Sequence, residues 1–408
     1  MNEEILYIIG LILVSLYLLL GFDDFIWDIY VIFKTMFTRK ENYNLEEVFK
    51  EPPKLMAVMI AAWEEDDVIE DVLNHFLNTT IYPRSQFHVF VGVYPNDLPT
   101  IEAVKRVQAQ FPNVHPVINE LEGPTTKAQN LNYVMKQIIK FEDEKGWRFQ
   151  SFTVHDSEDV IHPYELRMTN YLLKEHGGLQ FPVFPLVEYP TISNFLKNLT
   201  TNTYADEFAE HHYLTMVFRS KMNAFVPSAG TGFALRRDVM EQFENYAFLP
   251  TDSLTEDYKL AYELYKKGEH FHFVLNKVPY VNHKNKVKEH FVATRSMFPK
   301  TFKAAVRQKK RWITGITMQS INFRKAIRED NISFPAKYSL YRDLKAKIGN
   351  LLSFVGYPVF VYFIVSLFFD LPPIFPQGTL SYYLSILVSI MMMERLVFRS
   401  VSIYHVYG

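Results

Sequence analysis

The 408-residue sequence contains no cysteine, so it can form neither a disulfide nor a thiolate metal site. It also lacks an excess of either charge, because 43 lysines and arginines stand against 45 aspartates and glutamates. This balance does not indicate the basic surface that nucleic-acid binding requires. Apolar residues are abundant at 48%, and aromatic residues make up 16%. Such a chain can bury a sizeable core, and its aromatic content suits contact with a lipid bilayer.

Long charge-free stretches lie near both ends of the chain. Ile5 to Phe22 and Ile348 to Phe369 carry no charged residue, and a helix needs about 20 apolar residues to span a bilayer. A third stretch, from about Leu380, has to continue past two charged residues to reach that length. The first stretch could instead be a signal peptide, but Glu3 and Glu4 have the wrong charge for one. We therefore expect one N-terminal transmembrane helix and about two C-terminal ones.

Basic residues flank these stretches on one side only. They follow the first stretch and precede the second, whereas the loop from Asp370 to Thr379 has none. The flanking residues are Lys34, Arg39, Lys40, Arg342, Lys345 and Lys347. Because cytoplasmic flanks of membrane helices are enriched in lysine and arginine, the pattern predicts a multi-pass protein with the intervening segment in the cytoplasm.

Apolar runs alternate with amphipathic helical patterns between about residues 53 and 285. Leu55 to Ala62 and His88 to Val93 are continuous apolar runs, which are typical of strands buried on both faces. The alternation predicts an α/β fold with a doubly wound, mostly parallel sheet. Ligands bind at the carboxyl ends of such strands. The residues at these ends are Ala62 to Glu65, Tyr94 to Asp97 and His155 to Asp159.

Three carboxylates follow one predicted strand within four positions: Asp156, Glu158 and Asp159. They repel one another unless a cation joins them, and Mg²⁺ in proteins takes one or two carboxylates together with phosphate oxygens. The cluster therefore indicates a divalent-metal site for a diphosphate. The alternative is an acidic, solvated turn before Pro163.

A second acidic motif, Thr255-Glu256-Asp257, precedes a predicted helix that ends at Gly268. Acids in a first helical turn can simply complement the helix dipole. Alternatively, one of the two carboxylates is a general base that takes a proton from an attacking hydroxyl. The residues alone leave both interpretations open.

Basic and aromatic residues meet at Gln308-Lys309-Lys310-Arg311-Trp312, beside an apolar stripe of helical spacing. This pattern is typical of an amphipathic helix on a membrane surface. It also offers an arginine for a diphosphate and a tryptophan for a sugar ring. Lys127, at the start of a predicted helix after Gly123, is placed to hold a phosphate. Gly230-Thr231-Gly232 precedes a strand and says little by itself.

In this order, the motifs resemble those of family 2 glycosyltransferases with the GT-A fold. Ala62 to Glu65 is similar to the family's nucleotide-binding strand end, and residues 156–159 resemble its metal-binding DxD motif. Residues 255–257 look like its TED motif, and residues 308–312 match the QxxRW of processive enzymes such as cellulose and hyaluronan synthases. The chain is also similar to the bacteriophage-adsorption protein B group of inner-membrane glycosyltransferases.

The resemblance implies a role for each residue in an inverting transfer from a UDP-sugar. Asp257 would be the catalytic base, and Asp156 with Glu158 or Asp159 would hold Mg²⁺ or Mn²⁺. Many family members carry an aspartate pair for uracil where this chain has Asn96, which leaves Asn96 as the candidate for base recognition. The donor-binding residues would be Glu65, Asn96, Lys127, Asp156 and Arg311. The acceptor-binding residues would be Glu256, Gln308 and Trp312.

The implied product is a growing cell-surface glycan, extended by a hexose or N-acetylhexosamine on the cytoplasmic face of a bacterial inner membrane. Export or outer-membrane proteins would be further partners. Two alternatives stay open: transfer of a single sugar to a polyprenyl phosphate lipid, and a non-catalytic membrane or phage-receptor component. The expected domains are an N-terminal transmembrane segment (1–34), a GT-A domain (50–290), interfacial helices with QxxRW (291–335) and C-terminal transmembrane helices (346–400).

Overall fold

The structure is a computed structural model, and it describes residues 3–37, 42–188, 191, 193–194, 197–281, 285–366, 368–369 and 371–408. Arg39 and Lys40, which contribute to the expected orientation, lie outside the described residues. The chain divides into two compact units. The α/β unit comprises Glu41–Lys337, and the helical unit comprises Met1–Lys40 together with Tyr338–Gly408.

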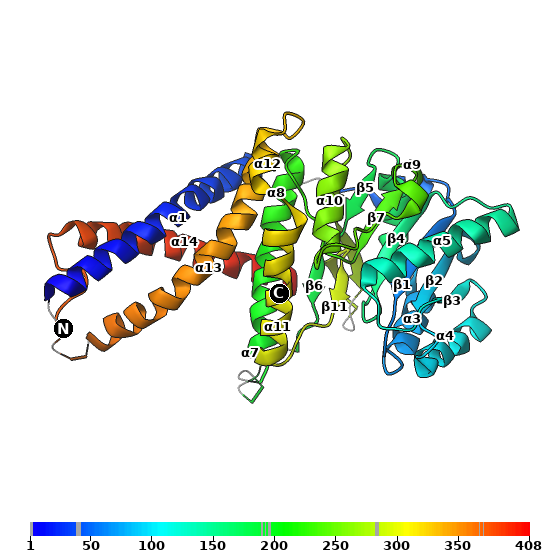
Figure 1. Ribbon diagram of the computed structural model, residues 1–408, viewed down its shortest axis with the longest axis horizontal. Helices are drawn as coiled ribbons and strands as arrows, with labels where there is room; N and C mark the ends of the chain where they lie inside the picture. Colours follow the sequence, from blue (N-terminus) through cyan, green and yellow to red (C-terminus); the bar gives the residue numbers. More distant parts are fainter. Residues whose placement is uncertain are drawn as a thin grey trace. The chain divides into compact units, whose positions relative to one another are not determined.

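The α/β unit is built on a seven-stranded sheet with the order β3-β2-β1-β4-β7-β5-β8 (Figure 1). Its strands are β1 (Met56–Ala61), β2 (Phe87–Val93), β3 (Val114–Ile118), β4 (Ser151–Asp156), β5 (Gly178–Gln180), β7 (Phe233–Arg236) and β8 (Phe271–Phe273). The first four strands are parallel, and β7 alone is antiparallel to both of its neighbours. The predicted mostly parallel α/β sheet is therefore confirmed, and it is typical of the GT-A fold.

Helices cover both faces of the parallel part of the sheet. On one face, α3 (Ile69–Thr79) and α4 (Leu98–Gln110) bury their apolar residues against alternate side chains of β1 and β2. On the other face, α5 (Lys127–Lys145) comes so close to β2 that a Cβ atom at Gly92 would lie 1.9 Å from Asn130. This close packing fixes the start of α5, which carries Lys127, relative to the carboxyl ends of the strands.

The α/β unit also contains further helices and two strand pairs. The helices are α2 (Leu45–Lys50), η1 (Arg84–Gln86), α6 (Glu165–Leu172), α7 (Leu199–Glu210), η2 (His211–Thr215), α8 (Met216–Lys221), α9 (Arg237–Met240), η3 (Glu244–Tyr246), α10 (Glu256–Lys266), α11 (Phe302–Thr314), η4 (Gly315–Ser320) and α12 (Phe323–Arg328). Two strand pairs complete it: β6 (Val183–Pro185) with β11 (Thr294–Ser296), and β9 (Lys277–Val281) with β10 (Val287–Phe291). The predicted interfacial segment thus belongs to the same compact unit as the sheet.

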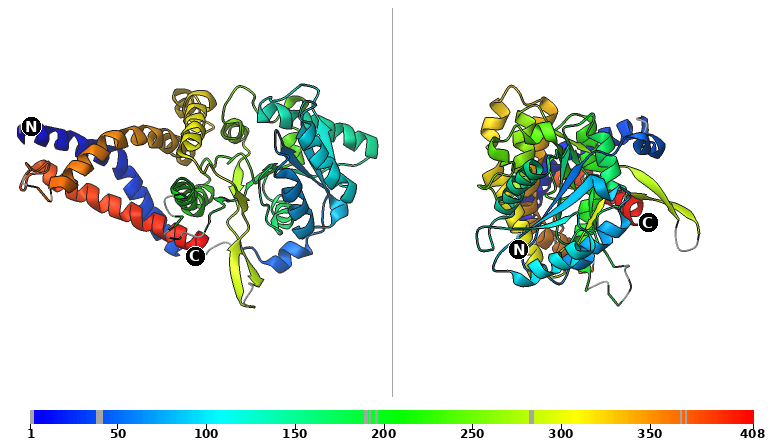
Figure 2. Two further views of the ribbon diagram at one scale, coloured as in Figure 1. Left: turned by 90° about the horizontal axis from the view of Figure 1, so that it is seen from below. Right: turned by 90° about the vertical axis from the view of Figure 1, so that its right-hand side faces the viewer.

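The helical unit contains α1 (Glu3–Phe37), most of α13 (Phe334–Ser366) and α14 (Leu380–Tyr407). The three helices lie side by side (Figures 1 and 2). Among the described residues, Glu3–Val31 is long and apolar enough to cross a membrane, whereas the apolar part of α13, Phe354–Ser366, is shorter. The N-terminal stretch is therefore a candidate span by length and composition, and the two C-terminal spans stay predictions.

Six charged side chains join the three helices of this unit in a group that we call the charge cluster. Its members are Asp23, Asp24 and Asp28 of α1, Arg342 and Lys345 of α13, and Arg395 of α14. Lys345 is only 5% exposed, and its Nζ lies 2.6 Å from Asp23 and 2.7 Å from Asp24. Asp23 directly follows the first charge-free stretch and Lys345 lies three residues before the second, so this ion pair brings the adjoining ends of the two stretches together.

Candidate active site

Lys127 connects two segments that are far apart in the sequence. Its Nζ pairs with the carboxylate of Asp156, the last residue of β4, and donates a hydrogen bond of 2.8 Å to the carbonyl oxygen of Gly230. The lysine stands at the first position of α5, where Thr126 and Gln129 form a capping box. Burial alone would lower the pKa of Lys127, but the charges of the surrounding carboxylates raise it, so the side chain stays protonated.

Gly230 brings Asp257 to the same place. Its φ angle is +81°, and a Cβ atom there would lie 2.9 Å from Oδ2 of Asp257. Glycine therefore satisfies both the left-handed backbone and the close approach of the carboxylate. Through this one residue, the structure brings Asp156 and Lys127 of the first half of the sheet to Asp257 in the first turn of α10.

The surroundings of Asp257 favour its protonated form. Burial, followed by the negative charge of Glu256, raises the pKa of Asp257 to about 7, although the charges of Lys127 and Arg311 act in the opposite direction. A general base works best when its pKa lies near the working pH. Asp257 therefore has the environment expected of a base, whereas a carboxylate that merely complemented a helix dipole would not need burial.

Carboxylates outnumber cations around these residues. Burial, then the charges of Asp156 and Asp159, raise the pKa of Glu158 to about 7. Burial also raises the pKa of Glu65, on which Asp156 acts in the same direction. Such mutual repulsion is relieved when a cation binds, so Asp156 and Glu158 fit a divalent metal.

The described residues contain no group of three or more histidines, aspartates and glutamates that could hold a metal ion. The site therefore offers too few protein ligands for a closed structural metal. It fits the coordination habit of Mg²⁺, which takes one or two carboxylates and completes its shell with phosphate oxygens and water.

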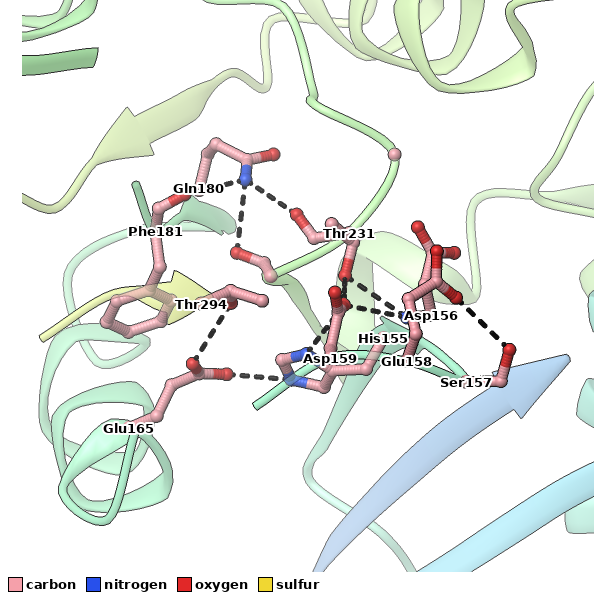
Figure 3. Close-up of polar contacts among 12 residues, drawn as sticks. His155, Asp156, Ser157, Glu158, Asp159, Glu165, Gln180, Phe181, Thr231 and Thr294 are labelled. Carbon is pink, nitrogen blue, oxygen red and sulfur yellow. Dashed lines mark hydrogen bonds and ion pairs between the residues drawn. The ribbon is translucent and has the colours of Figure 1, made fainter. Parts of the chain in front are cut away.

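Asp159 is turned away from this pair of carboxylates (Figure 3). Its Oδ2 accepts a hydrogen bond of 2.9 Å from the backbone N–H of Asp156 and another from the hydroxyl of Thr231. The imidazole of His155 lies between Asp159, at 3.8 Å, and Glu165, at 2.7 Å. Since Asp159 is 0% exposed, the geometry favours Glu158 over Asp159 as the second metal ligand.

The side chain of Gln180 holds the loop that carries Gly230 through hydrogen bonds. Oε1 of Gln180 accepts hydrogen bonds from the Ser228 hydroxyl at 3.1 Å and from the Ala229 N–H at 2.9 Å. Its Nε2 donates to the carbonyl oxygen of Thr231 at 2.8 Å. We call residues 228–232 the glycine loop. Sequence reasoning missed Gln180, because a single glutamine in a three-residue strand gives no signal.

Asn96 uses its side chain within the protein. Its Oδ1 accepts a hydrogen bond of 2.7 Å from the N–H of Gly123, and its Nδ2 donates to the Gly123 carbonyl at 2.9 Å. Both functional atoms of the amide thus hold the turn before α5. The rings of Trp63 and Tyr94 lie 5.3 Å apart beside Gly123, so aromatic side chains line this end of the sheet.

The predicted QxxRW residues lie on α11. Arg311 is exposed, and its positive charge acts to lower the pKa of Asp257. Trp312 is half-buried and packs against α7, with its ring 6.0 Å from Tyr204 and 6.1 Å from Phe208. Oε1 of Gln308 is buried and has no hydrogen-bond partner among the described residues. The structure therefore places Arg311 within electrostatic range of Asp257 and Trp312 on an aromatic surface.

The π-helical turn η4, which follows α11, packs directly on the segment before Asp257. A Cβ atom at Gly315 would lie 2.5 Å from Oγ1 of Thr255. The hydroxyl of Ser320 lies 2.9 Å from Oγ1 of Thr255 and 2.9 Å from the hydroxyl of Ser253. The helix of QxxRW and the residues of TED are thereby joined through close backbone contact.

Residues 52–315 match the family described as "Glycosyltransferase like family 2". The chain belongs to this family. Its relatives include the bacteriophage adsorption protein B of Escherichia coli (strain K12) and the bacteriophage N4 adsorption protein B of Escherichia coli O157:H7. Each is 34% identical over 385 residues, which cover 90% of this chain and 50% of the relative. The chain thus spans about half the length of these relatives.

Among solved structures, this family 2 glycosyltransferase is similar to the mannosyltransferase PcManGT from Pyrobaculum calidifontis in complex with GDP-Man and Mn²⁺. The TM-score is 0.56 at 15% identity, and the match covers 95% of this chain and 99% of that chain. At this identity the likeness shows a shared fold, which agrees with the mostly parallel sheet.

Proposed function

We propose that the chain is an inverting membrane glycosyltransferase that transfers a hexose or N-acetylhexosamine from a UDP-sugar to a glycan acceptor. One observation carries this proposal: Lys127 pairs with Asp156 and also binds the carbonyl of Gly230, against which Asp257 lies. A phosphate-binding cation, a metal-type carboxylate and a base-type carboxylate therefore share one site. Inverting sugar transfer needs these three functions together.

Each side chain has a defined task in this scheme. Lys127 and Arg311 bind the diphosphate of the donor and offset its charge. Asp156 and Glu158 would hold Mg²⁺ or Mn²⁺, which would neutralise the charge that develops on the departing nucleotide. Asp257 takes the proton from an acceptor hydroxyl, and that oxygen bonds to the anomeric carbon as the bond to the diphosphate breaks. Attack from the face opposite the leaving group inverts the anomeric configuration.

The acceptor side consists of Glu256, Gln308 and Trp312 in this proposal. Trp312 offers an apolar ring beside Arg311, and indole faces stack well on sugar rings. We assign a growing cell-surface glycan as the acceptor, because the QxxRW pattern resembles that of polysaccharide synthases. The name of the relatives, bacteriophage adsorption protein B, also suits a role connected with the cell surface.

The helical unit supports a membrane location for this activity. α1 contains a candidate span, Glu3–Val31, and α14 packs against α1. We propose that all three helices cross the bacterial inner membrane and that the α/β unit works on its cytoplasmic face. Export or outer-membrane proteins would then receive the product.

The test is nucleotide release by purified full-length protein in detergent, with a panel of UDP-sugars, Mn²⁺ and oligosaccharide acceptors. Release of UDP with one sugar, and its loss in the variant Asp257→Asn, would support the proposal. GDP-mannose belongs in the panel as a competing donor, and polyprenyl phosphate as a competing acceptor. Release with either competitor alone would replace the corresponding part of the proposal, and the absence of release with every donor would overturn it.

A further inference from the structure

The buried network behind Asp156 ends at the glycine loop. Asp159 contributes a single oxygen, Oδ2, to both the backbone N–H of Asp156 and the hydroxyl of Thr231 (Figure 3). The same Thr231 hydroxyl lies 3.2 Å from the N–H of Asp156 as its hydrogen-bond acceptor. These contacts connect the end of β4 to the glycine loop through the side chains of Asp159 and Thr231.

We propose that Asp159 and Thr231 are positioning residues that hold the glycine loop in register with the end of β4, and that Asp159 is not a metal ligand. This inference rests on the proposed function of the site. It adds a task for two residues that contact neither donor nor acceptor in the scheme above.

The rear of the network is built to keep Asp159 in place. His155 and Asp159 are both fully buried, and the imidazole lies between Asp159 and Glu165. Glu165 also accepts a hydrogen bond of 3.5 Å from the hydroxyl of Thr294. Side chains locked in this way by buried partners can hold a catalytic group within a fraction of an ångström.

At the glycine loop, the network is connected through Gly230 to both Lys127 and Asp257. Gly230 precedes Thr231, its carbonyl accepts the hydrogen bond of Lys127, and its Cα faces Asp257. A shift of the glycine loop would therefore change the distance between the base and the donor-binding lysine. Gln180 holds the backbone of the loop, the N–H of Gly232 donates a hydrogen bond of 2.9 Å to the carbonyl oxygen of Val154 in β4, and Thr231 adds a side-chain link to the end of β4.

One atom of Asp159 would suit the opposite assignment, in which Asp159 is a metal ligand. Oδ1 of Asp159 is buried and has no hydrogen-bond partner among the described residues, and a metal ion could use such an oxygen. The test must therefore separate positioning from ligation.

Thr231→Val and Thr231→Ser form a matched pair, because valine keeps the shape of threonine without the hydroxyl and serine keeps the hydroxyl. We expect Thr231→Val to lower kcat on the order of 10- to 100-fold, as small misplacements of reacting groups do. UDP affinity in Mn²⁺ should stay at the wild-type value, and amide hydrogen exchange in residues 228–232 should rise. Thr231→Ser should retain most of the turnover. Unchanged turnover and unchanged exchange in Thr231→Val would overturn the proposal.

Asp159→Asn and Glu158→Gln test the metal side by calorimetry of UDP with Mn²⁺. We expect Glu158→Gln to weaken binding and Asp159→Asn to leave it close to wild type. Equal weakening in both would make Asp159 a ligand and sink the proposal. If wild-type protein released no nucleotide from any donor, the proposed function would fail, while the exchange and calorimetry measurements would still decide the role of Asp159.

Discussion

The two units of the chain each contain a partly buried group of acidic side chains, but they balance the charge differently. In the charge cluster of the helical unit, three aspartates stand against two arginines and a lysine. In the active site, Asp156, Glu158 and Asp257 together with Glu65 and Glu256 share the charges of Lys127 and Arg311. The first group is electrically complete without a ligand, whereas the second has a surplus of negative charge.

The difference separates a structural role from a chemical one. Buried charges that are fully paired hold helices in a fixed register, and removing one partner leaves an uncompensated charge. Buried carboxylates without enough cations have raised pKa values, and such groups concentrate at functional sites. Substitutions in the two groups should therefore affect different properties of the protein.

The largest effect is expected for Asp257→Asn, which keeps the size of the base but cannot accept a proton. Loss of general-base help typically lowers turnover on the order of 10²- to 10⁴-fold. UDP affinity should persist, because the diphosphate is assigned to Lys127, Arg311 and the metal. Glu256→Gln is the neighbouring control and should lose less. Near-normal turnover in Asp257→Asn would remove this residue from the mechanism, and a parallel loss of UDP binding would move it to the donor site.

In the balanced cluster, Lys345→Met should reduce stability rather than catalysis. The change removes the lysine that pairs with Asp23 and leaves Asp24 paired with Arg342 alone, and breaking a buried pair costs about 3 kcal/mol. Thermal unfolding in detergent would measure the loss, with Lys105→Met on the exposed side of α4 as the control. Adding Asp23→Asn should recover part of the stability, because the stranded charge is then absent. A loss of stability no larger than that of Lys105→Met would show that the charge cluster does not stabilise the helical unit.

The surplus of carboxylates predicts that donor binding depends on a divalent ion. UDP should bind more weakly in EDTA than in Mn²⁺ or Mg²⁺. Glu158→Gln should weaken metal-dependent binding at least about 10- to 100-fold, since even outer partners of a metal contribute that much. Asp143→Asn, an exposed acid on α5, is the matched control. Equal UDP affinity with and without metal would contradict the comparison.

The smallest effect concerns pH. Because burial and Glu256 raise the pKa of Asp257 to about 7, its carboxyl gains a proton as the pH falls through that value, and the base is lost. The ratio kcat/KM should therefore fall about tenfold per pH unit below pH 7 and level off above it. Glu256→Gln removes one cause of the raised pKa, so it should move this limb to lower pH. A limb that stayed in place would assign the titration to another group.

Much of the α/β unit could be predicted from local patterns. The apolar runs at Leu55 to Ala62 and His88 to Val93 become β1 and β2 with ends displaced by one residue or less, because buried parallel strands need such runs. The family resemblance assigned Asp156, Lys127 and Asp257 to one site, and the structure has these side chains close together. Among the described residues the apolar part of α13 is Phe354–Ser366, and Leu367, which follows it, lies outside them, so the two predicted C-terminal spans stay predictions.

Side-chain direction could not be predicted in this way. Asp159 and Glu158 are adjacent in sequence, yet one faces a buried histidine and the other lies beside Asp156, because the turn after β4 sends successive side chains to different sides. Asn96 was expected to read a base, but its amide is bound to the backbone of Gly123. Contacts such as Gly315 with Thr255 join residues far apart in the sequence, and no local pattern reports them.

That last contact limits how the enzyme can adapt to acceptors of different width. The backbone of η4 touches Thr255 without an intervening side chain, so α11 cannot approach α10 further, and moving it outward would break the hydrogen bonds of Ser320. Asp257 on α10 and Arg311 on α11 are therefore held at a fixed separation. Variation in acceptor size within the family would have to be accommodated by side-chain replacement on these two helices or by a change in the glycine loop.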